Sequence, residues 1–190
     1  MSKVYDRIDD KLAAWLTAQP VFFVATAPLS DEGHVNLSPK GMDGTFAVLG
    51  ERTVGYLDYF GSGVETVAHL RENGRITIMT CAFEGRPLIV RLYGRGRVVL
   101  ADDPEFEVLR PRFAKAREIG LRSIIVVDCD RIADSCGWSV PRMEHVEDRT
   151  ILDLAQQRRT EDYYAEYAVT ANAQSIDGLP GLPPAVAAIR

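Results

Sequence analysis

Short runs of β-branched and aromatic residues, separated by turn residues, fill most of the chain between residues 21 and 128. Runs of this length and composition are typical of strands. A doubly wound fold needs a helix after nearly every strand, and this chain lacks those helices. The spacing therefore predicts a small antiparallel barrel that is mainly β with peripheral helices (α+β). The predicted strands cover 21–27, 34–40, 45–49, 53–58, 75–82, 88–100 and 123–128.

Helical patterns surround these strands. Apolar residues at helical spacing predict an opening helix over 6–18, and Gly61-Ser62-Gly63 precedes a second helix. Further helices are predicted over 102–116 and within 148–168. With 190 residues, no internal repeat and no linker, the chain is expected to form a single domain. We divide it into an N-terminal helix (1–20), a barrel core (21–130), a loop with C-terminal helices (131–173) and an extended tail (174–190).

The charge balance narrows the class of partner. The 27 acidic residues outnumber the 22 basic ones, which gives a formal net charge of −5 and argues against a nucleic-acid binder. No apolar run approaches the ~20 residues of a membrane span, and no signal peptide is visible. We therefore expect a cytoplasmic protein without a membrane partner. The three cysteines form no CxxC pair and the three histidines are widely spaced, so we predict reduced thiols and no metal site.

The predicted strand 34–40 alternates polar and apolar residues. One face carries His34, Asn36, Ser38 and Lys40. The other face carries Val35 and Leu37, because successive side chains of a strand point to opposite sides. The polar face is either a solvated outer surface or a ligand face, on which Lys40 meets an anion or an electron-rich ring edge.

The Gly61-Ser62-Gly63 segment stands immediately before a predicted helix. Free N–H groups and the helix dipole make such an N-terminus suitable for a phosphate. Ser62 and Thr66 add hydroxyl donors one turn apart, whereas Glu65 would repel a phosphate at which it pointed. The alternative is that Ser62 only caps the helix.

The long strand 88–100 carries an alternating basic face. Its residues are Arg91, Tyr93, Arg95 and Arg97. Arg91 lies between apolar neighbours, and a partly buried arginine needs an anion or a hydrogen-bonded partner. The others are expected to be exposed, where they can serve a dimer surface.

Cys136 and Trp138 stand together in an irregular segment. Cys136 is either a nucleophile, for which no histidine partner lies nearby, or a small residue in a turn. Trp138 either plugs the core or covers a flat ligand. The sequence contains no Ser–His–Asp arrangement, P-loop or paired carboxylates, so the chemistry is expected to belong to an organic cofactor that the protein orients.

Three segments together resemble the flavin-binding split-barrel family related to pyridoxamine 5'-phosphate oxidase. They are Asn36–Gly41 (NLSPKG), Leu57-Asp58 with the following Gly61–Thr66 (GSGVET), and Val90–Gly94 (VRLYG). A later segment, Ser135–Pro141 (SCGWSVP), looks like the SCG(Y/F/W)xVP segment of one bacterial branch of that family. The resemblance runs from about residue 20 to 145.

The resemblance implies a six-stranded split barrel of the FMN-binding type, a homodimer and two FMN molecules at the dimer interface. In this family the strand that matches 35–40 lines the flavin, so Lys40 is expected near the ring system and the segment 62–66 near the phosphate. Trp138 would come from the partner chain. The implied cofactor-binding residues are Asn36, Ser38, Lys40, Gly41, Asp58, Ser62, Gly63, Thr66, Arg91 and Trp138.

The sequence also departs from the true oxidase. The oxidase has an arginine at the position of Val35 and an Arg-Lys pair where this chain has Glu65 and Thr66. Its C-terminal Arg-x-His substrate motif is absent here, where Pro141–His145 reads PRMEH. These departures argue against pyridoxamine phosphate as the substrate.

The leading hypothesis is therefore an FMN-dependent oxidoreductase-like protein that acts on an unidentified small molecule. A second hypothesis keeps the fold and replaces FMN by a deazaflavin, whose longer anionic tail would use Arg91, Arg95 or Arg97. A third is a non-catalytic module that binds a flavin or haem. For haem, the axial ligand would be His34, His69 or His145.

Overall fold

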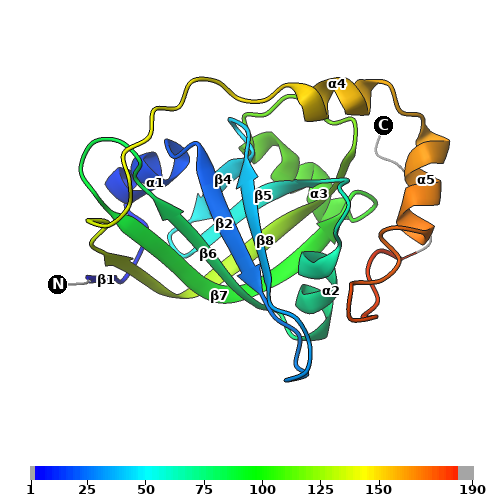
Figure 1. The fold of residues 1–190 in the computed structure, drawn as a ribbon, viewed down its shortest axis with the longest axis horizontal. Helices are drawn as coiled ribbons and strands as arrows, with labels where there is room; N and C mark the ends of the chain where they lie inside the picture. Colours follow the sequence, from blue (N-terminus) through cyan, green and yellow to red (C-terminus); the bar gives the residue numbers. More distant parts are fainter. Residues whose placement is uncertain (1–2, 184–190) are drawn as a thin grey trace.

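An antiparallel sheet of eight strands, curled into a half-barrel, forms the centre of the fold (Figure 1). The computed structural model describes residues 3–183. The strand order is β3-β2-β6-β7-β8-β5-β4, and β1 pairs with β8. The prediction of an antiparallel split barrel is confirmed, with eight strands in place of six. The strands are β1 (Val4–Tyr5), β2 (Val21–Thr26), β3 (Asn36–Gly41), β4 (Phe46–Gly50), β5 (Thr53–Tyr59), β6 (Arg75–Cys81), β7 (Ile89–Leu100) and β8 (Leu121–Ser135).

Short helices lie around the edges of the sheet. They are α1 (Asp10–Thr17), α2 (Glu65–Glu72), α3 (Pro104–Leu109) with a 3₁₀ turn at Arg110–Arg112, α4 (Ile151–Gln157) and α5 (Glu161–Val169). Helix α1 begins where the Asp9 carboxylate accepts a hydrogen bond from the Leu12 N–H at 2.8 Å. Its buried face, Leu12 and Leu16, packs into the barrel.

Strand β8 is longer than the predicted 123–128, and both of its faces are covered over residues 124–127 only. Ile125 and Val127 face the barrel core, whereas Ile124 and Val126 pack under α3. A strand that is buried on both sides is apolar throughout, as residues 124–127 are. Beyond Asp128 the sequence loses this apolar signature, although the pairing with β7 continues to Ser135.

Two parts of the chain differ from the sequence prediction. The N-terminal region contains strand β1, which pairs with Ile132 and Ala133 and is too short to leave a pattern. The described part of the tail, 174–183, is not extended. It folds back through a bridge between Gln174 and Pro180, because Leu182 is buried with the aromatic residues of α5. Residues 184–190 lie outside the described part.

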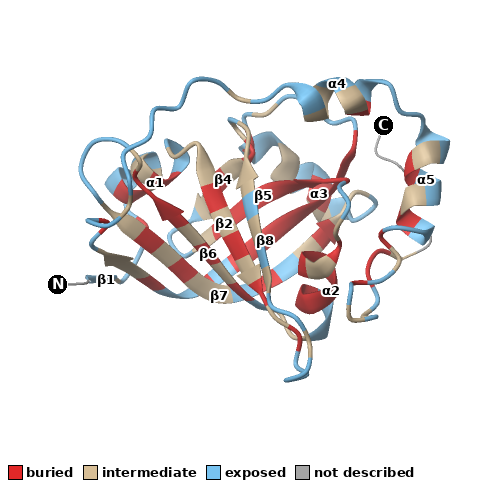
Figure 2. Ribbon diagram, viewed as in Figure 1, coloured by how far each residue is buried: buried red, intermediate tan, exposed pale blue. Residues whose placement is uncertain are grey.

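Residues 136–150, which we call the strap, connect the end of β8 to α4. The strap crosses the open end of the barrel as the yellow trace in Figure 1. Figure 2 shows that it is largely exposed, while the strands beneath it carry the buried core. Residues of the strap and of the strands together line a cavity, which is described below.

Within residues 3–183, no helix combines the length and the apolar character that crossing a membrane requires. The same part of the chain contains no group of three or more His, Cys, Asp or Glu residues that could hold a metal ion.

Candidate functional site

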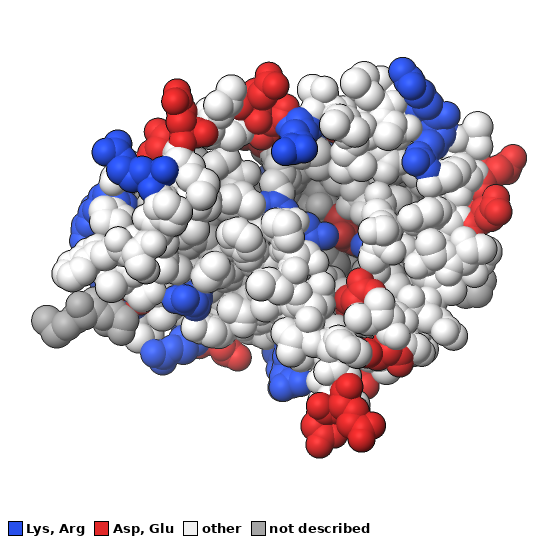
Figure 3. Space-filling view, viewed as in Figure 1, with Lys and Arg blue, Asp and Glu red and all other residues white. Residues whose placement is uncertain are grey.

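A polar cavity of about 370 Å³ lies between strand β3 and the N-terminal end of α2. It brings together six of the predicted cofactor-binding residues: Asn36, Ser38, Lys40, Ser62, Gly63 and Thr66. The rest of the lining comes from Pro39, Tyr59, Gly61, Glu65 and Arg122. In Figure 3 a hollow near the middle of the molecule has basic and acidic atoms at its bottom.

The polar face of β3 points into the structure and its apolar face points outward. Val35 and Leu37 are 72% and 67% exposed, whereas Asn36, Ser38 and Lys40 are partly buried. This arrangement is the reverse of a solvated polar face over an apolar core. The interpretation as a solvated outer surface is therefore wrong, and the ligand face stays a prediction.

A hydrogen-bond network fixes the amide of Asn36. Its Nδ2 donates to Thr26 Oγ1 and to Thr66 Oγ1, each at 3.0 Å, and its Oδ1 accepts from Ser38 Oγ at 2.8 Å. Thr26 Oγ1 also lies 3.0 Å from Nδ1 of His69, which is fully buried in α2. The network joins β2, β3 and α2 beneath the cavity. Thr66, which accepts from Asn36, also lines the cavity.

A buried charge cluster forms the floor beside this network. Asp58 accepts from Arg122 Nε at 2.7 Å and from Ser123 Oγ at 3.1 Å, and Lys40 Nζ lies 3.6 Å from its other oxygen. Burial alone would raise the pKa of the Asp58 carboxyl. The charges of Arg122 and Lys40, with these hydrogen bonds, outweigh burial and hold that pKa below its ordinary value.

Helix α2 presents an uncapped N-terminus to the polar cavity. The N-cap residue is Val64, and no side chain accepts a hydrogen bond from the first turn. Ser62 is therefore not the cap, and its hydroxyl faces the cavity lining instead. Free N–H groups at a helix start favour an anion. The negative charge of the Glu65 carboxylate counteracts the attraction of this helix start for an anion. Its Oε1 accepts a hydrogen bond from the Ile176 N–H at 3.4 Å.

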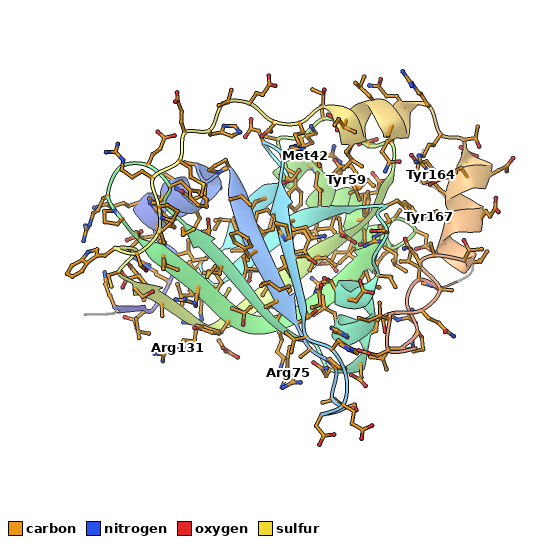
Figure 4. The ribbon with its side chains drawn as sticks, in the orientation of Figure 1. Met42, Tyr59, Arg75, Arg131, Tyr164 and Tyr167 are labelled. Carbon is orange, nitrogen blue, oxygen red and sulfur yellow. The ribbon has the colours of Figure 1, made fainter. Side chains whose placement is uncertain are left out.

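A second, larger cavity of about 1220 Å³ adjoins the first. The two share Pro39, Lys40, Tyr59 and Gly61 in their linings. The large cavity extends beneath the strap and α4, and Gly41, another predicted residue, lines it. Figure 4 shows Met42 and Tyr59 in the region below the strap and α4. Lys40 thus stands at the junction of a polar space and a wide apolar one.

Three predicted residues line neither cavity: Asp58, which lies behind Lys40 and Arg122, and Arg91 and Trp138, which lie apart from the site. Arg91 donates to Ser135 Oγ at 2.9 Å across the β7–β8 pair. Trp138 is 84% exposed on the strap. The single chain does not bring either of them to the site, and the predicted contribution of Trp138 from a partner chain stays a prediction. His34 leaves the polar row as well, because its ring pairs with Asp177 at 2.7 Å.

Sequence reasoning missed Arg122 and Thr26, and it named His69 only as a possible haem ligand. Arg122 lies 3% exposed in a strand of otherwise apolar character, and it also donates to the backbone oxygen of Gly63 at 3.1 Å. A charged residue at the start of an apolar strand was the available signal, since a buried arginine needs partners. Thr26 and His69 carried no such signal.

The curled antiparallel sheet is a split barrel, with a polar cavity at a helix N-terminus and a wide apolar cavity beside it. The family model for pyridoxamine 5'-phosphate oxidase matches residues 8–136. The pyridoxamine 5'-phosphate oxidase family protein ustO of Aspergillus flavus is 37% identical over 192 residues, covering 94% of this chain and 77% of that protein. This chain belongs to the pyridoxamine 5'-phosphate oxidase family, as the sequence motifs predicted. Because that relative is fungal, the bacterial branch stays a prediction.

Solved structures show the same fold. HupZ from Group A Streptococcus superimposes with a TM-score of 0.53 and 21% identity, covering 66% of this chain and 91% of that one. A variant of HupZ in which one histidine is replaced by alanine gives a TM-score of 0.54 and 20% identity, covering 67% and 99%. At these identities the likeness concerns the fold of the barrel alone.

Proposed function

We propose that this chain is an FMN-dependent oxidoreductase that works as a homodimer with the cofactor at the interface. The observation that carries the proposal is the joined pair of cavities. A polar space with hydroxyl and cationic donors adjoins a wide apolar space, and Lys40 lies where they meet. FMN has the same two-part chemistry, a phosphate on a polyhydroxyl chain and a flat ring system.

The donor set of the polar cavity fits a phosphate. The hydroxyls of Ser62 and Thr66, the uncapped N–H groups of α2 and the guanidinium of Arg122 would hold it. Asn36 and Ser38 would face the polyhydroxyl chain, and Lys40 would lie beside the ring system. Bound FMN supplies a ring that accepts and returns a hydride, and the protein supplies orientation and charge.

The proposed dimer rests on the exposed side of β3. This strand stands at one end of the sheet order, so its outer edge is unpaired within the described chain. Val35 and Leu37 expose apolar side chains there, and such surface is typical of an interface. A partner chain would cover this surface and bring its own Trp138 to the cofactor.

The deazaflavin alternative lacks support from the basic face of β7. Arg97 is held by a double contact to Glu105, with both distances 2.6 Å, and Arg95 donates to the Asn73 carbonyl. With Arg91 on Ser135, none of the three lines either cavity. A longer anionic tail would find no further cation where the hypothesis needs one.

The test is the spectrum and mass of the protein purified from an expression host. We expect flavin absorption bands, one FMN per chain released on denaturation, bleaching by NADPH or NADH, and a dimer mass by light scattering. A colourless protein that does not bind added FMN would contradict the proposal. A flavin that neither nicotinamide cofactor reduces would favour the non-catalytic module.

A further inference from the structure

The large cavity beneath the strap lacks the features of a phosphate site. We infer that it is the substrate cavity and that it takes a bulky apolar molecule without negative charge. The description of the ligand as a substrate rests on the proposed function. The binding preference itself follows from the walls of the cavity.

The size and the surface of the cavity favour a bulky apolar ligand. Small-molecule sites usually enclose roughly 300–1,000 Å³, and about 1220 Å³ leaves room for a large molecule beside a cofactor ring. The inner wall includes Met42, Leu57 and Phe60, and the outer wall includes Ile151 and Leu152 from α4. Burying an apolar ligand against such walls is favourable because it removes apolar surface from water.

The charges around the cavity disfavour an anion. Glu84, Glu144 and Glu147 line it, and none of these three carboxylates forms an ion pair with another described residue. Of the cations in the lining, Lys40 is engaged with Asp58. Arg149 is the other cation in the lining, against these three carboxylates.

The remaining charged groups in the lining do not alter this balance. Asp148 accepts from the His145 ring at 3.1 Å and from the Asp43 N–H at 2.8 Å, so its carboxylate is already engaged. We call the carboxylates of Glu84, Glu144 and Glu147 the rim of the cavity. The unpaired charge at this rim is therefore negative. It repels anions, while neutral and cationic ligands are accepted.

The outer wall lies outside the part of the chain that matches the family model. That match ends at residue 136, whereas Glu144, Glu147 and the apolar residues of α4 follow it. The barrel that would hold the cofactor is thus a family feature. The outer wall follows the matched residues, in the strap and α4, and lies within the 94% of this chain that the family relative ustO covers.

Three naphthalene probes of nearly equal size separate shape from charge. They are 1-naphthylmethylamine, 1-naphthalenemethanol and 1-naphthoate, a cation, a neutral molecule and an anion at pH 7. Equilibrium dialysis measures their binding to the protein with and without FMN. We expect the amine and the alcohol to bind at least tenfold more tightly than the naphthoate.

A double variant tests whether the rim sets this order. The double variant Glu144→Gln with Glu147→Gln removes two rim charges. The ratio of the affinity for the alcohol to the affinity for the naphthoate should then fall at least threefold. The matched control is Glu161→Gln with Glu166→Gln, which removes two exposed charges from α5, away from the cavity. The control should leave the ratio of these two affinities unchanged.

A filling variant tests the location. Ile151 lines the cavity but is 69% exposed, so Ile151→Trp can enter the space without disturbing the core. The Ile151→Trp variant should weaken the binding of all three probes at least fivefold. Ala155→Trp, also in the lining, serves if the first variant unfolds.

The outcomes distinguish this inference from the proposed function. Equal binding of alcohol and naphthoate, no binding of any probe, or folded tryptophan variants that bind like the wild type would each overturn the inference. None of these results depends on FMN. A protein that orders the probes as expected and still fails to bind FMN would overturn the proposed function and leave the binding preference in place.

Discussion

At the scale of single residues, the buried pair of Asp58 and Arg122 ties the candidate site to the stability of the fold. Both residues are almost fully buried, at 1% and 3% exposure. A buried charge whose partner is removed is strongly unfavourable, because it has lost both water and its counter-charge. The same pair therefore orders the floor of the polar cavity and makes it intolerant of substitution.

Asp58→Asn should destabilise the protein by about 3–5 kcal/mol, since it leaves the Arg122 guanidinium buried and unpaired. Chemical denaturation at pH 7 measures the difference. The control is Glu51→Gln, which breaks an ion pair with Arg7 whose side chains are 63% and 71% exposed. That change should cost at most about 1 kcal/mol. Equal effects of the two substitutions would contradict the role assigned to burial.

The same substitution should lose its effect in acid. The pKa of Asp58 lies below its ordinary value of 3.8 in the folded protein, so its contribution is present above that value and is lost as the pH falls through the folded pKa. The stability gap between wild type and Asp58→Asn should narrow from pH 5 toward pH 2. A gap that stays constant over this range would show that the ionised carboxylate is not responsible.

The three cysteines should differ in their reactivity toward thiol reagents. Cys136 is exposed, whereas Cys81 and Cys129 are buried. Burial raises the pKa of both buried thiols, that of Cys129 to about 11, so their thiolate fraction is small at neutral pH. A maleimide reagent at pH 7 should modify one thiol in the native protein and three after unfolding. Rapid native modification at Cys129, located by peptide mass, would contradict this burial.

The sequence predicted many of the residues that line the site, but not the long-range hydrogen bonds that hold them in place. Asn36, Ser38 and Lys40 were visible because alternation along a strand places them on one face. Arg122 was not, because its partners Asp58 and Asn172 are 64 and 50 residues away in the sequence. A contact between distant segments leaves no local pattern, so only the folded chain reveals it.

At the scale of elements, the long pairing of β7 with β8 contains an irregularity, and a bulge bends the strand that carries it. The register of this pair shifts between Tyr93 and Gly94, which marks a bulge. A Cβ atom on Gly94 would lie 2.1 Å from the Asp128 carbonyl oxygen, closer than any real contact. Gly94 is thus required by a close backbone approach, one of the features that a glycine inside a strand commonly marks.

Gly94→Ala should therefore destabilise the protein by about 1–3 kcal/mol, as overpacking does elsewhere. Thermal and chemical denaturation measure this effect. Gly50→Ala is the matched control in β4, because its Cβ would meet nothing closer than 3.8 Å. An equal response of the two variants would contradict the close approach at the bulge.

Element types were predictable and some element ends were not. The hairpin of β4 and β5 and the helix before β6 follow from local turn and capping residues. The length of β8 depends on its pairing with β7 as far as Ser135, and the return of 174–183 depends on the burial of Leu182. Both are set by tertiary contacts, which override local composition.

At the scale of the whole molecule, one chain forms two adjoining cavities and leaves an apolar edge uncovered. Family motifs predicted the barrel and the polar cavity, but the large cavity could not be predicted. It depends on where the strap crosses the barrel, and an irregular segment carries no periodicity from which to place it. As proposed above, the barrel holds the cofactor, the strap selects the substrate and a second chain completes the site.

The most direct test of the central claim compares FMN with riboflavin by isothermal titration calorimetry, because the two molecules differ only in the phosphate. We expect the wild-type protein to bind FMN at least tenfold more tightly than riboflavin. We also expect Thr66→Val to narrow this difference by removing a hydroxyl donor from the polar cavity. Equal affinities for the two flavins, or no binding of either, would contradict the assignment of the polar cavity to a phosphate.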